Sequence, residues 1–203
     1  MINMTREEIA PGICVYDNVM PNGENLYKEI EEGMSSSQTE WRDAYVAERE
    51  QQAGVNKKTR NTLSLVVPYI GGKKELEGND LHQLLLTSLG NLFFEHYHPI
   101  EKHYQNSFGV EFGWHEEYSV LKYGEGQFFT NHIDDHPHYP RRVSTIHYLN
   151  EDYTGGELNF PRFNLSFKPK TNQMILFPST YTYNHSVSEV TSGTRYAIAS
   201  WLR

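Results

Sequence analysis

The sequence of 203 residues contains a single cysteine, Cys14. One cysteine excludes an intramolecular disulfide and a zinc site built from several thiolates. No apolar run approaches the roughly 20 residues that a membrane-spanning helix needs, and the first residues lack the apolar segment of a secretory signal. These absences predict a cytoplasmic protein that has no membrane partner.

Basic residues are also few, because 18 Lys and Arg stand against 26 Asp and Glu, giving a formal net charge of −8. This negative charge disfavours nucleic-acid partners. The sequence also lacks the stripe of basic and aromatic residues that would indicate a nucleic-acid demethylase. Aromatic residues are abundant instead, with 14 Tyr and 10 Phe, which is typical of a chain with a buried core. Without repeats or linkers, we expect one domain over residues 1–203.

The sequence of the N-terminal half predicts helices and contains a polar segment. We expect a strand over residues 13–19, a helix over 24–32, and an amphipathic helix over 79–104 that is broken near Pro99. The helical stripe of the last segment consists of Leu81, Leu85, Leu89 and Leu92, widened by Leu84, Leu86, Phe93 and Phe94. Residues 35–61 are polar, with Lys57, Lys58 and Arg60 near their end, and predict a loop or lid.

From residue 118 onward, short apolar or alternating runs separated by turn signals predict strands. Their expected ranges are 118–123, 128–134, 143–149, 157–160, 164–168, 173–177, 185–190 and 195–202. The pattern favours an α+β, mainly β fold: a double-stranded β-helix, or jelly roll, with N-terminal helices packed on one sheet. Residues 110–203 would carry its core.

The densest chemistry lies in NHIDDH, residues 131–136. His132 and Asp134 are two residues apart, so in a strand their side chains would point to the same face. With His185 as a third ligand they would form the two-histidine, one-carboxylate triad that is typical of non-haem Fe(II) oxygenases. A solvated polar turn is the alternative interpretation, and the rival ligands are Asp135, His136 and His138.

The last predicted strand, RYAIASWL, strengthens the metal interpretation. Alternation would place Arg195, Ala197, Ala199 and Trp201 on one face, which describes a fixed cation with space beside it. A dicarboxylate could therefore bind the metal at one end and Arg195 at the other, since a guanidinium matches a carboxylate well.

Three segments, YSVLKYGEGQFFTNHIDD, RRVSTIHYLNEDYTGGELNF and HSVSEVTSGTRYAIASWL, resemble prolyl 4-hydroxylase-type 2-oxoglutarate/Fe(II)-dependent dioxygenases. The resemblance covers residues 115–203 and implies the cofactors Fe(II), 2-oxoglutarate and O2, with ascorbate as a further one. It also implies roles for ten residues. His132, Asp134 and His185 would bind iron; Arg195 and Tyr148 would bind the distal 2-oxoglutarate carboxylate; Tyr123 would lie near the chelating end; Leu158, Ile146 and Trp201 would line the pocket; and Arg141 would lie near the substrate.

One departure from the family concerns Phe129, which stands where many members have a tyrosine three residues before the first histidine. Another is the ten-residue spacing of His185 and Arg195, which matches the collagen type, although the arginine itself matches the hypoxia type. The sequence thus mixes two subfamily patterns.

We expect hydroxylation of a C–H bond, first of all prolyl 4-hydroxylation of a proline-containing peptide or protein with release of succinate and CO2. The alternatives are hydroxylation of a free amino acid or another small-molecule substrate, a zinc hydrolase, and a non-catalytic jelly-roll binding module. Binding of 2-oxoglutarate separates the oxygenases from the last two. Trp41, Trp114 and Cys14 are expected to be packing residues.

Overall fold

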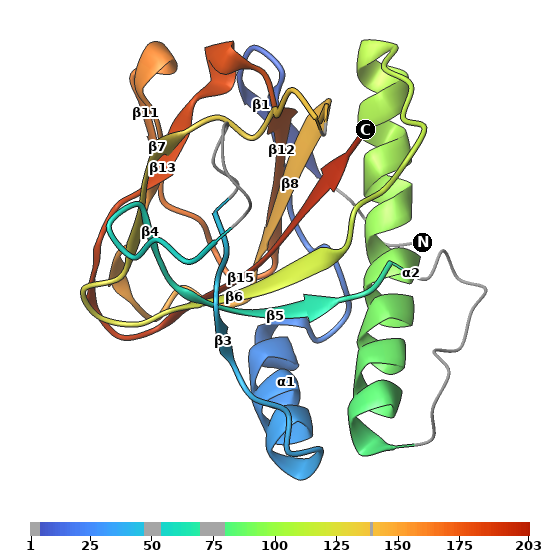
Figure 1. Ribbon diagram of the computed structural model, residues 1–203. Helices are drawn as coiled ribbons and strands as arrows, with labels where there is room; N and C mark the ends of the chain where they lie inside the picture. The colour runs from blue at the N-terminus through green and yellow to red at the C-terminus, as the bar shows by residue number, and fades with distance from the viewer. Residues whose placement is uncertain (1–4, 47–53, 70–79, 139) are drawn as a thin grey trace.

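The computed structural model describes residues 5–46, 54–69, 80–138 and 140–203 (Figure 1). It contains two long helices, α1 (Leu26–Ser36) and α2 (Leu81–Phe108), and three short 3-10 helices, η1 (Gly23–Asn25), η2 (Pro161–Phe163) and η3 (Tyr181–Tyr183). All strand pairs of the described residues are antiparallel. Among the described residues, no helix is both long enough and apolar enough to cross a membrane.

The strands form two main sheets and one isolated pair. The larger sheet consists of β1 (Arg6–Ala10), β2 (Ile13–Tyr16), β3 (Arg42–Asp43), β5 (Leu63–Val67), β6 (Tyr118–Tyr123), β8 (Val143–Tyr148), β12 (Gln173–Pro178) and β15 (Arg195–Leu202). The smaller sheet consists of β4 (Arg60–Asn61), β7 (Phe128–His132), β10 (Leu158–Phe160), β11 (Leu165–Phe167) and β13 (His185–Val187). The pair consists of β9 (Thr154–Gly155) and β14 (Val190–Ser192).

The sheets show the interleaved strand order of a jelly roll. The larger sheet runs β1-β2-β12-β8-β15-β6-β5-β3, and the smaller one runs β11-β10-β13-β7-β4. Apart from consecutive strands such as β1 and β2 or β10 and β11, neighbours in each sheet come from distant parts of the chain, because the strands pass back and forth between the two layers. The predicted mainly-β jelly roll is confirmed.

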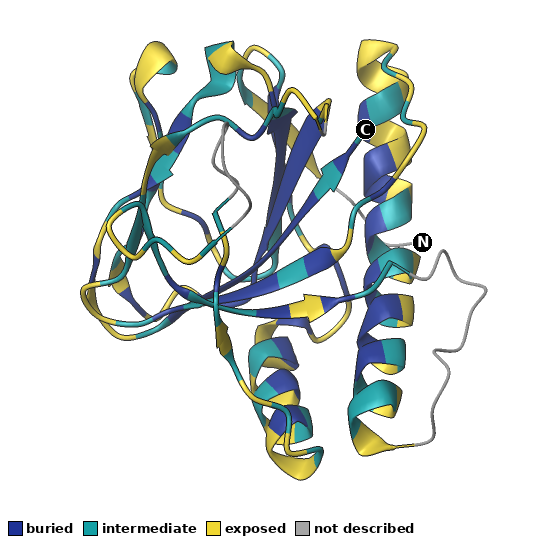
Figure 2. Ribbon diagram, in the orientation of Figure 1, coloured by how far each residue is buried: buried dark blue, intermediate teal, exposed yellow. Residues whose placement is uncertain are grey.

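Helices α1 and α2 cover the outer face of the larger sheet (Figures 1 and 2). In α1 the buried side chains recur every fourth residue, at Leu26, Ile30 and Met34, which is the spacing of one helical face. They meet sheet residues such as Val120 and Ile198 in the first of two cores. The prediction that helices pack on one sheet is therefore confirmed.

The second core lies between the two sheets. Strand β15 contributes to both cores, since alternate side chains point to opposite faces. Tyr196, Ile198 and Leu202 face the helices, whereas Ala197, Ala199 and Trp201 face the smaller sheet. This alternation matches the sequence prediction.

The second helix differs from its prediction. It continues unbroken through Pro99, which lies on the solvent-exposed side where water can satisfy the backbone carbonyl that the proline ring leaves unpaired. The predicted apolar stripe was placed wrongly at its start, because Leu81 and Leu84 are 61% and 51% exposed. Residue 79 lies outside the described residues. The buried apolar side chains are Leu86, Leu89, Phe93, Tyr97, Ile100 and Tyr104, and Gly90 and Glu101 are buried on the same helix.

The polar stretch 35–61 is not simply a loop. It supplies β3 at the edge of the larger sheet and β4 at the edge of the smaller sheet, while its residues 47–53 lie outside the described residues. Strands β1 and β5 were not predicted at all, and the predicted strand 185–190 is interrupted, with β14 pairing instead with β9. Two packing residues agree with expectation: Cys14 is fully buried, and Trp41 packs against the first core.

We expect His147 to make the folded protein sensitive to acid. Burial lowers the pKa of His147 to about 3, and the Tyr97 hydroxyl donates to its Nδ1 (2.8 Å) while Nε2 donates to Asn172 Oδ1 (3.2 Å). Since the unfolded chain takes up this proton near pH 6.5, stability falls as the pH drops from 6.5 toward 3, by about 2 kcal/mol at pH 5. Urea unfolding at pH 7.5 and pH 5 measures this effect: the free energy of unfolding should change less between the two pH values in His147→Gln than in the wild type. An equal change in both proteins would contradict this role.

Candidate metal centre and inner cavity

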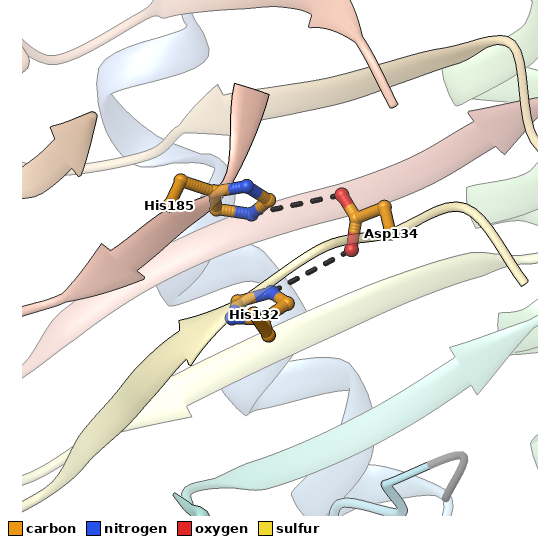
Figure 3. Close-up of side chains that lie close together, drawn as sticks. All are labelled: His132, Asp134 and His185. Atoms are coloured by element: carbon orange, nitrogen blue, oxygen red, sulfur yellow. Dashed lines mark ion pairs between the residues drawn. The ribbon is translucent and has the colours of Figure 1, made fainter. Parts of the chain in front are cut away.

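Three of the predicted ligands converge at one end of the smaller sheet (Figure 3). His132 ends β7 and His185 begins β13, and the two residues lie opposite each other in the antiparallel pair. One ligand atom from each of His132, Asp134 and His185 lies within 4.8 Å of the others. In the described parts of the chain, the rivals Asp135, His136 and His138 belong to no such group.

Asp134 reaches the site by a different route from the one predicted. Strand β7 ends at His132, so Asp134 lies in the irregular segment after it rather than on the same strand face. The carboxylate nevertheless turns toward both histidines, with Oδ1 3.5 Å from His132 Nε2 and Oδ2 3.6 Å from His185 Nε2. The buried Ser144 hydroxyl donates to Oδ2 at 2.6 Å and fixes its position.

Both imidazoles are oriented for metal binding. Nδ1 of His132 donates to the Thr130 carbonyl at 2.8 Å, and Nδ1 of His185 donates to the Tyr183 carbonyl at 3.1 Å. With the proton on Nδ1, the Nε2 lone pair of each ring is directed to the shared space, as in most protein metal sites. The residues present therefore fit a divalent metal with nitrogen and oxygen ligands.

The charge states of the site also suit a metal. Burial raises the pKa of Asp134, but His185 and His132 outweigh this effect and hold the pKa well below its usual value. Burial, together with the neighbouring His132, lowers the pKa of His185 to about 4. At neutral pH the carboxylate is thus ionised and His185 is neutral, which are the forms that bind metal.

Arg195 lies in a narrow inner cavity that the three ligands also line. Its side chain is 1% exposed, and within the described chain its Nε and Nη1 atoms have no hydrogen-bond partner and no carboxylate forms an ion pair with it. The guanidinium lies 4.9 Å from the Tyr123 ring centroid and 5.0 Å from that of Tyr148. A buried cation without a counter-charge is costly, so the cavity is suited to an anionic ligand.

The order of these residues along the chain matches a known family. Residues 118–203, which include the triad and Arg195, match the model of the 2OG-Fe(II) oxygenase superfamily, where 2OG denotes 2-oxoglutarate. Residues 118–203 are a 2OG-Fe(II) oxygenase domain. This region resembles prolyl 4-hydroxylase-type members of the superfamily, as the sequence predicts, and the match supports an oxidoreductase of the dioxygenase class.

Curated relatives of this oxygenase domain include several hydroxylases. A prolyl 4-hydroxylase-type protein of Acanthamoeba polyphaga mimivirus is 27% identical over 125 residues, which cover 52% of each chain. A PKHD-type hydroxylase of Prochlorococcus marinus is 38% identical over 38% of this chain and 37% of its own length. Human prolyl 3-hydroxylase 2 is 39% identical over 30% of this chain and 9% of its own length. The chain thus spans about half or less of the curated relatives that it matches.

Solved structures share the fold over nearly the whole chain. A Pseudomonas putida prolyl-4-hydroxylase superposes with a TM-score of 0.67 at 15% identity, covering 95% of this chain and 92% of that one. A Trichoplax adhaerens prolyl hydroxylase, solved with a peptide fragment of hypoxia inducible factor, superposes with a TM-score of 0.66 at 18% identity. The match covers 94% of this chain and 83% of that one. These likenesses establish the jelly-roll architecture around the oxygenase site.

Two tyrosine hydroxyls lie beside Arg195 in the oxygenase domain. The hydroxyls of Tyr148 and Tyr153 are both buried and approach the Arg195 guanidinium, without the geometry of a regular hydrogen bond to any described residue. Burial raises the pKa of each tyrosine, so both remain protonated donors. Tyr148 was predicted from the sequence, whereas Tyr153 was missed, since it approaches Arg195 only through the turn at Gly155 and Gly156.

The other predicted pocket residues divide into two groups. Tyr123, Ile146 and Trp201 line the inner cavity together with Ala199. Leu158 is fully buried in the core between the sheets and does not line the cavity. It supports the surrounding wall rather than facing the space beside the metal ligands.

A wide outer cleft of about 960 Å³ opens onto the metal ligands, and His132, Asp134, Arg141 and Trp201 are among its lining residues. Arg141 donates twice to Glu116, at 2.9 and 2.7 Å, and its guanidinium lies 3.8 Å from the Trp201 ring centroid. Arg141 is therefore a fixed cation on the wall of the cleft that His132 and Asp134 also line, and its place near the substrate stays a prediction.

Trp114 also lines this cleft, and it corrects an expectation. The sequence predicts a packing role for Trp114, but the residue is 67% exposed. It follows the end of helix α2, where its backbone pairs with Arg203 rather than its ring entering a core. An exposed indole at a cleft is a ready contact for a ligand, because it offers a large rigid apolar surface.

Proposed function

We propose that this chain is an Fe(II)- and 2-oxoglutarate-dependent dioxygenase that hydroxylates a prolyl residue in a peptide or protein. The observation that carries the proposal is the buried, unpaired guanidinium of Arg195 in the same cavity as the His132, Asp134 and His185 triad. A hydrolase or a structural metal site gives no reason for this cation. An oxygenase that binds a dicarboxylate requires one.

His132, Asp134 and His185 would hold Fe(II) and leave its other positions open. The bound iron would supply the activation of O2 that couples oxidative decarboxylation of 2-oxoglutarate, to succinate and CO2, to hydroxylation of the substrate. Ascorbate is the proposed reductant that keeps the iron ferrous. The remaining work belongs to the protein, which must bind both molecules in fixed positions.

Arg195 would bind the distal carboxylate of 2-oxoglutarate, with Tyr148 and Tyr153 donating to the same group. Charge-assisted hydrogen bonds in a buried site are strong, since no water competes for them. Ile146, Ala199 and Trp201 line the cavity, where they would pack beside the carbon chain and exclude water from it. Tyr123 lies opposite Arg195 and lines the same cavity, where it would position the cosubstrate.

The outer cleft supports a peptide substrate over a free amino acid. Its volume of about 960 Å³ far exceeds what one amino acid needs, and its wall carries the exposed ring of Trp114 and the fixed cation of Arg141. The relatives include prolyl hydroxylases, one of which was solved with a peptide. Arg141 is proposed to contact the peptide near the metal site.

Succinate release from 2-oxoglutarate, with Fe(II) and ascorbate, tests the proposal. A panel of proline-containing peptides should stimulate release, with a matching mass gain of one oxygen in the peptide. Release that responds only to free amino acids would retain the oxygenase and replace the peptide by a small molecule. Absence of release from protein with confirmed metal loading would contradict the catalytic function.

A further inference from the structure

Arg60 approaches the metal centre from outside residues 118–203, the stretch that matches the superfamily model. It lies in β4, directly opposite Phe129 of β7, and its guanidinium lies 4.8 Å from the centroid of the Phe129 ring. The Phe129 ring stacks in turn on the imidazole of His132, with 3.6 Å between centroids and 14° between planes. One aromatic ring thus separates this cation from a metal ligand.

The surroundings of Arg60 leave part of its guanidinium available. Nη1 donates to the Tyr45 carbonyl at 2.9 Å, which fixes the side chain. Nε is buried, and neither a hydrogen-bond acceptor for it nor an ion pair of Arg60 with a carboxylate is found among the described residues. The neighbouring cations differ, because Lys57 pairs with Asp43 at 2.9 Å and Lys58 is exposed.

Arg60 lines both the outer cleft and the inner cavity, so it lies at the boundary between them. Among the described residues, the inner cavity is lined by two arginines, Arg60 and Arg195, and by one carboxylate, that of Asp134. Asp134 is already engaged with the two histidines and Ser144. These described residues therefore give the cavity an excess of positive charge, with one cation next to the Phe129 ring and the other next to Tyr148.

We propose that Arg60 binds the carboxylate adjacent to the keto group of 2-oxoglutarate, an inference that rests on the proposed function. A 2-oxo dicarboxylate carries a negative charge at each end, and Arg195 can satisfy only one of them. Phe129 has no hydroxyl to offer, whereas the Arg60 guanidinium, 4.8 Å from its ring centroid, provides charged donors in the wall of the same cavity. The contact with this ring also holds the side chain in place, which reduces the entropy lost on binding.

Calorimetric titration of the Mn(II)-loaded protein without O2 tests this role independently of turnover. The variants are Arg60→Gln, which removes the charge, and Arg60→Lys, which keeps it; Lys58→Gln is the matched control from the same segment, facing neither cavity. Arg60→Gln should raise the Kd for 2-oxoglutarate at least about tenfold. Arg60→Lys should lose less, and Lys58→Gln should match the wild type.

A second ligand identifies which carboxylate Arg60 contacts. 2-Oxobutanoate retains the carboxylate beside the keto group and lacks the distal one. Arg60→Gln should therefore raise the Kd for 2-oxobutanoate, measured by competition, by a factor similar to that for 2-oxoglutarate. An effect on 2-oxoglutarate alone would assign Arg60 to the distal end and overturn the inference. So would a Kd for Arg60→Gln within twofold of wild type, with melting temperature and Mn(II) affinity unchanged. Wild-type protein that takes up Mn(II) but no 2-oxoglutarate would instead reject the proposed function itself.

Discussion

Replacing Arg195 by methionine is expected to make the ligand-free protein more stable while removing its ability to bind 2-oxoglutarate. The guanidinium is buried without a carboxylate partner among the described residues, and methionine fills similar volume without that desolvation cost. Exchange of a buried charge for an apolar group can raise the free energy of unfolding by about 1–4 kcal/mol. Urea unfolding of both proteins measures the difference.

The same substitution should weaken 2-oxoglutarate binding by about 1.5–3 kcal/mol, or about 10–150-fold, since it removes a charged hydrogen-bond donor. Added 2-oxoglutarate and Mn(II) should therefore raise the melting temperature of the wild type more than that of Arg195→Met. Arg162→Met makes the same exchange at an exposed position and should change neither quantity. A variant that is less stable, and binds the dicarboxylate normally, would remove Arg195 from the cosubstrate site.

Asp134→Ala is expected to abolish turnover by removing the anionic ligand of the triad. Even groups that only orient a ligand contribute about 10–100-fold to metal affinity, so loss of the ligand itself should cost at least about 100-fold. Titration with Mn(II) measures this directly, and circular dichroism establishes that the variant is folded. Succinate release should fall to background in parallel.

Asp135→Ala is the matched control, because Asp135 is the neighbouring carboxylate and the rival ligand. Its Oδ1 accepts from the Arg141 backbone amide at 3.1 Å rather than facing the histidines. This variant should therefore retain metal affinity within a few-fold of wild type. If metal binding instead depended on Asp135 and survived loss of Asp134, the assignment of the triad would be wrong.

Local patterns predicted the parts of the molecule in which neighbours in sequence determine the outcome. The two faces of β15 followed from alternation alone, as did the buried small residues beside Arg195. Convergence of His132, Asp134 and His185 was predicted correctly for a partly wrong reason, since Asp134 is held by Ser144 and not by a strand. Sequence spacing was enough to identify the three residues, but tertiary contacts determine how their side chains are positioned.

The parts that were missed depend on contacts between distant segments. Arg60 reaches the cavity only because β4 joins the edge of the smaller sheet, a pairing that no property of the polar stretch 35–61 reveals. Tyr153 approaches Arg195 through two glycines with positive φ, where the chain turns back on itself. Helix α2 continues through Pro99 because that residue faces solvent, which a one-dimensional pattern cannot indicate.

The division of β15 between two cores has an evolutionary consequence. Side chains that face the helices, such as Ile198, keep the sheet folded, whereas those that face the smaller sheet, such as Ala199, shape the cavity. Because the two sets alternate along one backbone and do not touch, substitutions in one should leave the other nearly unaffected. A descendant could thus acquire a new ligand by exchanging every second residue of this strand, while the hydrophobic layer beneath the helices is inherited unchanged.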